Sequence, residues 1–216
     1  MKRKYVLLGV VLILLVAVLC SCGVVGEIAQ EAKNIMEAQD GRQMTIDDDG
    51  TVEVFYGTYQ IPQGWEYSEK YTIDTDALAG KLFFIKSDVE PAGKYPTNIS
   101  IEYGTNSYGV EDHERFRDSI LAQLQTQMTE GDGILTGAGS YTAQGYRVYR
   151  FGIGEDESED GISTVQYYIV GDRQYVMVHM TDFHDPSVLD ADEAAQQIVD
   201  SFIWIEDEGN LEGQED

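Results

Sequence analysis

The hydrophobic pattern of the chain changes its period several times between residues 51 and 205. Alternating or continuous apolar runs, which are typical of strands, occur at residues 52–56, 81–86, 98–103, 134–142, 146–153, 163–170 and 174–180. A four-residue spacing, typical of a helix, puts Phe116, Ile120 and Leu124 on one face of residues 112–129 and recurs at residues 190–202. These elements predict an α+β fold in which one mainly antiparallel sheet is flanked by helices.

Two local signals refine the expected boundaries. The alternation at residues 52–56 continues along the chain, so that a single strand is expected to run until Pro62 interrupts it. At the start of the second helix, Asp190 is followed three residues later by Glu193. This spacing is a capping-box pattern and predicts that the Asp190 side chain caps the helix.

The first 21 residues have the pattern of a secretory signal peptide. A basic head, Lys2-Arg3-Lys4, leads into an apolar run at residues 5–19. The run closes on Leu-Cys-Ser-Cys-Gly, which resembles the lipobox of bacterial lipoproteins and predicts Cys22 as the acylated residue. The alternative is a retained transmembrane helix, because the apolar character extends to Gly26. Both interpretations hold the basic head in the cytoplasm and place the remaining chain outside it.

The composition of the remaining chain predicts three segments and argues against nucleic acid as a partner. Residues 22–50 are expected to be a partly helical tether, residues 51–205 a globular domain, and residues 206–216 a disordered acidic tail. The chain carries 39 Asp and Glu against 14 Lys and Arg, a formal charge of −25. Such an acidic surface repels nucleic acid, which is therefore not expected as a partner. Cys20 is expected to leave with the signal peptide and Cys22 to carry the lipid, so no disulfide is expected in the domain.

Three segments resemble the PsbP-like family, which includes an extrinsic subunit of photosystem II, a Ran-binding nuclear import factor and short bacterial lipoproteins. The segments are YQIPQGW at residues 59–65, QYYIVGDRQYV at residues 166–176 and IVDSF at residues 198–202. The resemblance implies an α-β-α sandwich that serves as a binding or docking module without catalysis. It carries over no functional residues, since no metal or Ran-contact motif is present to match.

The residues capable of metal binding are few and poorly spaced. Asp156 and Asp160 fit the first and fifth positions of an EF-hand loop, but Tyr167 stands where the twelfth position requires Glu. His179 and His184 lie five residues apart, which is not a zinc-ligand spacing on a helix or strand. These four side chains remain weak metal candidates, with low-affinity Ca²⁺ as the ion for the acidic loop.

No catalytic signature accompanies them. The chain contains no G-x-S-x-G elbow, no S-x-x-K, no P-loop and no G-x-G-x-x-G. The sequence therefore predicts a non-enzymatic, cofactor-free lipoprotein, anchored to the extracytoplasmic face of the cell membrane. Its expected role is a binding or adaptor domain for a surface protein or peptide. The alternatives are a solute- or cation-binding lipoprotein and, third, a hydrolase.

The lipidation hypothesis predicts the outcome of one substitution. Cys22→Ala removes the only thiol in the lipobox position, so the variant should incorporate no radiolabelled fatty acid, whereas the wild-type chain does. Cys20→Ala is the matched control and should leave labelling unchanged. Labelling that persists in Cys22→Ala would exclude Cys22 as the acylated residue.

Overall fold

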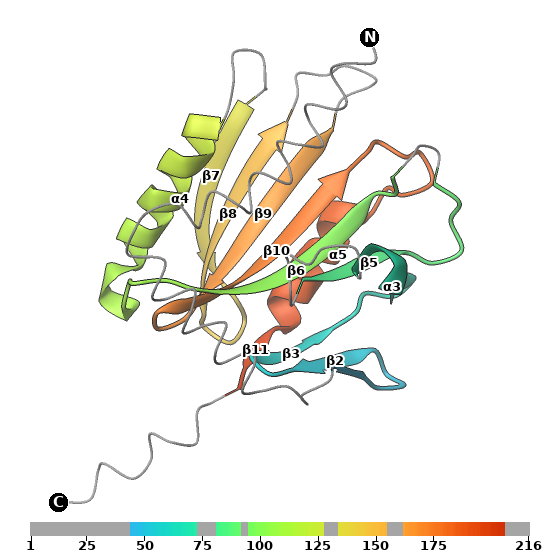
Figure 1. Ribbon diagram of the computed structural model, residues 1–216, viewed down its shortest axis with the longest axis horizontal. Helices are drawn as coiled ribbons and strands as arrows, with labels where there is room; N and C mark the ends of the chain where they lie inside the picture. Colours follow the sequence, from blue (N-terminus) through green and yellow to red (C-terminus); the bar gives the residue numbers. More distant parts are fainter. Residues whose placement is uncertain (1–43, 73–80, 92–94, 128–133, 155–161, 206–216) are drawn as a thin grey trace, which may run out of the picture.

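The computed structural model describes residues 44–72, 81–91, 95–127, 134–154 and 162–205. Its centre is a seven-stranded antiparallel sheet with the order β4-β5-β6-β10-β9-β8-β7. The strands are β4 (Trp65–Tyr67), β5 (Leu82–Lys86), β6 (Asn98–Thr105), β7 (Ile134–Tyr141), β8 (Arg147–Gly154), β9 (Ser163–Val170) and β10 (Gln174–Asp182). The antiparallel sheet predicted from the alternating runs is confirmed, and its longest strand, β10, lies at its middle (Figure 1).

A second, four-stranded sheet lies below the central one in Figure 1. It consists of β1 (Thr45–Ile46), β2 (Thr51–Val54), β3 (Gly57–Gln60) and β11 (Ile203–Trp204). Gly57 permits the close contact of β3 with β11, because a Cβ at this position would lie 2.5 Å from the carbonyl oxygen of Ile203. The last strand, β11, is thereby paired with β3, which lies near the start of the described chain.

The second sheet corrects two predictions, the single sheet and the uninterrupted strand before Pro62. The chain turns at Phe55 and Tyr56, so that β2 and β3 form a hairpin. Tyr56 belongs to the turn but is buried. The sequence therefore has an apolar residue in the turn, where the alternation of an uninterrupted strand would also place one. Periodicity alone therefore could not locate this turn.

Helices cover both faces of the central sheet. The described helices are α3 (Glu69–Thr72), the short 3₁₀ segment η2 (Val110–Asp112), α4 (His113–Gln127) and α5 (Ala191–Ser201). Phe116, Ile120 and Leu124 of α4 pack on one face, and α5 packs on the other against β10, β6 and β3. The α+β class with a helix on each side of the sheet is thus as predicted.

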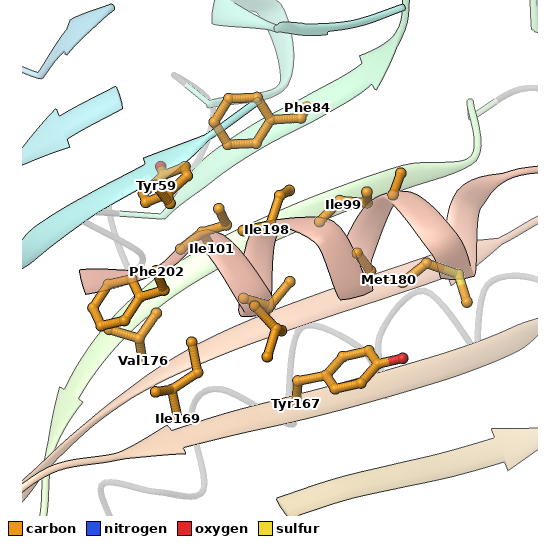
Figure 2. Close-up of a cluster of buried hydrophobic side chains, with 14 of the residues drawn as sticks. Tyr59, Phe84, Ile99, Ile101, Tyr167, Ile169, Val176, Met180, Ile198 and Phe202 are labelled. Atoms are coloured by element: carbon orange, nitrogen blue, oxygen red, sulfur yellow. The ribbon is translucent and has the colours of Figure 1, made fainter. Parts of the chain in front are cut away.

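The two faces of the central strands are both apolar. On β9, Tyr167 and Ile169 point toward α5, whereas Tyr168 and Val170 point toward α4. Figure 2 shows the core on the α5 side, where Ile198 and Phe202 meet side chains of the sheet. Continuous apolar runs in the sequence reflect this burial on both sides.

The predicted capping box at the start of α5 does not form. Asp190 makes no side-chain hydrogen bond to the helix, although its backbone carbonyl accepts a bond of 2.8 Å from the Ala194 N–H. Its carboxylate instead pairs with the ammonium group of Lys86 on β5. An opposite charge brought close by the fold competes with the local amide donors for the same carboxylate oxygens.

Several sequence predictions fall outside the described residues. These are the signal peptide with Cys22, most of the tether, the acidic loop with Asp156 and Asp160, and the acidic tail. Within the part of the chain that the structure describes, no helix is long and apolar enough to cross a membrane.

The packing of α5 yields a prediction for stability. Ile198 is 1% exposed in the core, whereas the neighbouring Gln197 is exposed. Ile198→Ala should lower the free energy of unfolding by about 2–5 kcal/mol through lost burial and the cavity left behind. Gln197→Ala, the control on the same helix, should change it by less than about 0.5 kcal/mol. Urea denaturation of both variants measures the difference, and equal stabilities would contradict the packing described for α5.

Candidate functional site

The two histidines that the sequence pairs as weak metal candidates lie in different environments. His179 is 6% exposed on β10, on the sheet face that α4 covers in part. His184 follows β10 in a loop, with a positive φ of 53° and an exposed side chain. Its Nδ1 lies 3.7 Å from Oδ2 of Asp182. Among the described residues, no three His, Cys, Asp or Glu side chains gather as they would around a metal ion.

Burial controls the charge of His179. Loss of hydration lowers its pKa to about 3, and the nearby Lys81 ammonium acts in the same direction. Its imidazole is therefore neutral at physiological pH. Its Nε2 is buried and has no hydrogen-bond partner within the described part of the chain.

Lys81 and Glu102 form a buried ion pair on the same sheet face. Lys81 Nζ lies 3.8 Å from Glu102 Oε2, and the two side chains are 8% and 18% exposed. Burial lowers the pKa of Lys81 and raises that of Glu102, and the attraction between them opposes both shifts. No sequence pattern predicts this pair, because it depends on β5 lying beside β6.

A cleft of about 670 Å³ opens at the N-terminal end of α4. Its walls come from η2 and α4, the β9–β10 turn, the β7–β8 hairpin and β11. The aromatic lining residues are Tyr141, Tyr146, Tyr149 and Trp204, the acidic ones are Glu111, Glu114 and Asp172, and Arg147 and His113 complete the charged or titratable set. The cleft therefore offers rings for stacking and charges of both signs.

Hydrogen bonds hold the walls of the cleft together. His113 Nε2 lies 3.1 Å from the Gly171 carbonyl oxygen, which ties the start of α4 to the β9–β10 turn. The backbone N–H of Arg173 in this turn donates to the Tyr108 carbonyl at 3.0 Å. Trp204, which lines the cleft, packs edge-on against Phe202, with ring centroids 4.9 Å apart. The cleft is thus bounded by groups held in place from several elements.

Strand β7 is an edge strand of the central sheet, and its last residue, Tyr141, lines this cleft. Its residues 136–141 are all exposed, and among the described strands it pairs only with β8. The Thr142 N–H donates to the Tyr146 carbonyl at 2.9 Å, and Gly145 with φ of 87° closes the turn. Because backbone groups alternate along an antiparallel strand, the N–H and C=O groups of Gly137, Gly139 and Tyr141 point to the open edge.

The side chains of β7 lack two common protections of an edge strand. The sequence of β7, ILTGAGSY, contains neither charge nor proline, and both are common on edge strands that avoid pairing. The other edge strand, β4, has only three residues. The apolar pattern predicted a strand at residues 134–142 but not its position at the edge of the sheet. The only sequence signal was the small, uncharged side chains.

The buried His179 generates a prediction for the pH dependence of stability. Its pKa is lowered from 6.5 to about 3 on folding, so the unfolded chain binds the proton more tightly. The stabilising contribution is complete above pH 6.5 and is lost as pH falls toward 3. Between pH 7 and pH 5, the wild-type chain should lose about 2 kcal/mol more unfolding free energy than His179→Gln. Urea titrations at both pH values measure this, and parallel losses would show that His179 is not buried as a neutral group.

Comparison with known proteins gives structural likeness only. No family model matches the sequence, and no curated protein matches it. One similar solved structure is a protein from Bacteroides thetaiotaomicron (14% identity, TM-score 0.42). It matches over 70% of this chain and 46% of its own, so this chain spans about half its length.

Two other similar structures are matched over most of their length. LpqN, involved in cell envelope biogenesis of Mycobacterium tuberculosis, has 12% identity and a TM-score of 0.45, covering 78% of this chain and 87% of its own. The cyanobacterial PsbP (CyanoP) of Synechocystis has 11% identity and a TM-score of 0.41, covering 76% and 92%. A cyanobacterial PsbP is therefore among the solved structures to which this chain is similar.

Proposed function

We propose that this chain is a membrane-anchored, extracytoplasmic binding domain that captures an extended segment of a partner protein along β7. The observation that carries the proposal is the open edge of β7, which is exposed and unprotected among the described strands. A strand added to a sheet edge gains main-chain hydrogen bonds, while side chains enter pockets beside it. The cleft at the end of β7 provides such a pocket.

The glycines of β7 favour an incoming strand. Gly137 and Gly139 direct their backbone groups to the open edge and carry no side chain on the α4 side of the strand. A partner strand can therefore approach without displacing side chains at these two positions. Tyr141, which is 66% exposed at the end of β7, is available to pack on the bound segment.

Binding is proposed in preference to catalysis. His179 is buried and neutral, so it is unsuited to general acid–base chemistry near pH 7. The cleft instead combines aromatic rings with a few charged groups, a composition that suits recognition of a peptide.

The anchor is part of the same proposal. Acylation at Cys22 would hold the domain at the membrane, and residues 23–43 would separate it from the lipid surface. The excess of acidic side chains supports this arrangement, since a chain of formal charge −25 is repelled by anionic headgroups. The binding edge would then face the extracytoplasmic space.

Photo-crosslinking in the native host tests the capture of a partner. Tyr141→p-benzoylphenylalanine should yield adducts whose mass-spectrometric fragments map to one short segment of one partner. Leu189, which is 90% exposed beyond the other end of β10, takes the same substitution as the control and should give no such adduct. Adducts of equal yield and identity at both positions would contradict capture at β7.

A proline in the edge strand shows whether main-chain pairing is responsible. Gly137→Pro removes an outward N–H, and it should lower the Tyr141 adduct yield about tenfold or more. Gly137→Ala is the matched control, because its Cβ would make only ordinary contact at 3.5 Å with Phe151, and it should leave the yield unchanged. If the adduct proves to be a second copy of this chain, the edge mediates self-association and partner capture is wrong.

A further inference from the structure

Arg147, at the start of β8, is held between two aromatic rings beside the open edge. Its guanidinium carbon lies 4.8 Å from the ring centre of Tyr141 and 5.0 Å from that of Tyr149. Cation–π attraction to two rings at this distance restricts the position of the guanidinium. Hydrogen bonding to Tyr149, the largest cause, and to Tyr141 raises the pKa of Arg147. Because a guanidinium carries several N–H donors, it can donate to a further acceptor as well. The side chain is only partly buried, so a bound molecule can reach it.

A glycine makes room for this arrangement. Gly139 lies opposite Tyr149 in the ladder, and a Cβ at Gly139 would lie 2.9 Å from Nη2 of Arg147. Any larger residue would therefore displace the guanidinium from its position. The absence of a side chain at residue 139 thus leaves the strand edge open and leaves room for the guanidinium. We call this position of the guanidinium, against Tyr141 and Tyr149, the Arg147 seat.

Among the described arginines, Arg147 and Arg173 lack the acidic partner that the other three have. Arg115, Arg117 and Arg150 each lie within 4.0 Å of an aspartate, at 3.3, 2.7 and 3.2 Å respectively. Within the described ranges of the chain, no carboxylate lies that close to Arg147. In a chain with 39 acidic residues, an accessible guanidinium without a carboxylate is available for an external one.

We propose that Arg147 binds a carboxylate of the segment captured on β7, and so selects partners with an acidic group opposite Tyr141. The proposal rests on the proposed function, because it names the chemistry of the segment that β7 receives. The carboxylate belongs to an Asp or Glu side chain or to a peptide C-terminus. Glu111, Glu114 and Asp172 on the facing walls repel further negative charge, so the flanking residues of the segment are neutral or basic.

Selection from a peptide library tests this specificity. The full-length chain in detergent micelles is immobilised and presented with random dodecapeptides displayed with free C-termini. The wild-type chain should enrich peptides that share one acidic position or a common C-terminus. Arg147→Glu reverses the charge at the seat, and it should enrich peptides with Lys or Arg at that position instead.

Affinity measurements on the selected peptides separate the sources of the carboxylate. Arg147→Gln should weaken binding of wild-type-selected peptides about tenfold or more, since a charge-assisted hydrogen bond is lost. Replacing the shared Asp or Glu by its amide should cause the same loss if a side chain is bound. Amidation of the C-terminus should do so if the terminal carboxylate is bound.

Two further variants separate the seat from general effects on the fold. Gly139→Ala keeps the charge and displaces the guanidinium, so it should weaken the same peptides. Arg150→Gln removes an arginine that pairs with Asp192, and it should bind them as the wild type does. Melting temperatures show that each variant is folded, and Gly139→Ala tests the seat even if Arg147→Gln unfolds.

The failures of the two proposals are distinguishable. If the wild-type chain enriches no peptide above background, capture on β7 is wrong, and the role of Arg147 falls with it. If peptides are enriched and bind Arg147→Gln and Gly139→Ala as tightly as the wild type, the carboxylate seat is overturned while edge capture stands. Loss of binding in both variants, with Arg150→Gln unaffected, supports the seat.

Discussion

The structure depends on the burial of its central strands on both faces. Tyr167 and Ile169 of β9 are covered from the α5 side, and Tyr168 and Val170 from the α4 side. Each such side chain contributes about 1.5–3 kcal/mol when it is removed from water. Because successive residues of a strand point to opposite faces, neither helix could be omitted without exposing half of this apolar surface.

The same arrangement determines where the sheet is open. The α4 side chains meet β8, β9 and β10, and α5 meets β10, β6 and β3, so cover is concentrated over the middle of the sheet. Strand β7 contributes Leu135 to the α4 cluster but keeps six consecutive exposed residues, 136–141. The binding edge is therefore a consequence of how two helices cover seven strands.

Charge is distributed unevenly over this framework. Lys86 and Arg150 pair with Asp190 and Asp192, one at the N-cap and one in the first turn of α5, and thereby join the sheet to the helix start. Lys81 instead meets Glu102 on the sheet face, where burial makes the pair costly unless both charges are present. Arg147 differs from these cations, since aromatic rings rather than carboxylates hold it.

Local sequence patterns were sufficient for the strands and helices whose periodicity is strong. The α4 stripe of Phe116, Ile120 and Leu124 and the runs that became β9 and β10 needed only the spacing of apolar residues, because burial on a regular element repeats with its own period. The leader and Cys22, which were predicted from a local pattern and a lipobox resemblance, lie outside the described residues and stay predictions. The β2–β3 turn was not predicted, since Tyr56 is buried within the bend and continues the alternation.

The candidate site was decided by tertiary structure. Glu111, Arg147, Asp172 and Trp204 line one cleft although they come from four separate segments, and no spacing along the chain records that proximity. The pairing of Asp190 with Lys86, in place of the predicted cap, has the same cause. The sequence by itself determined which residues are apolar, which are charged and which elements they form. Only the packing of those elements decided which charges meet, because distance in space, and not along the chain, governs their attraction.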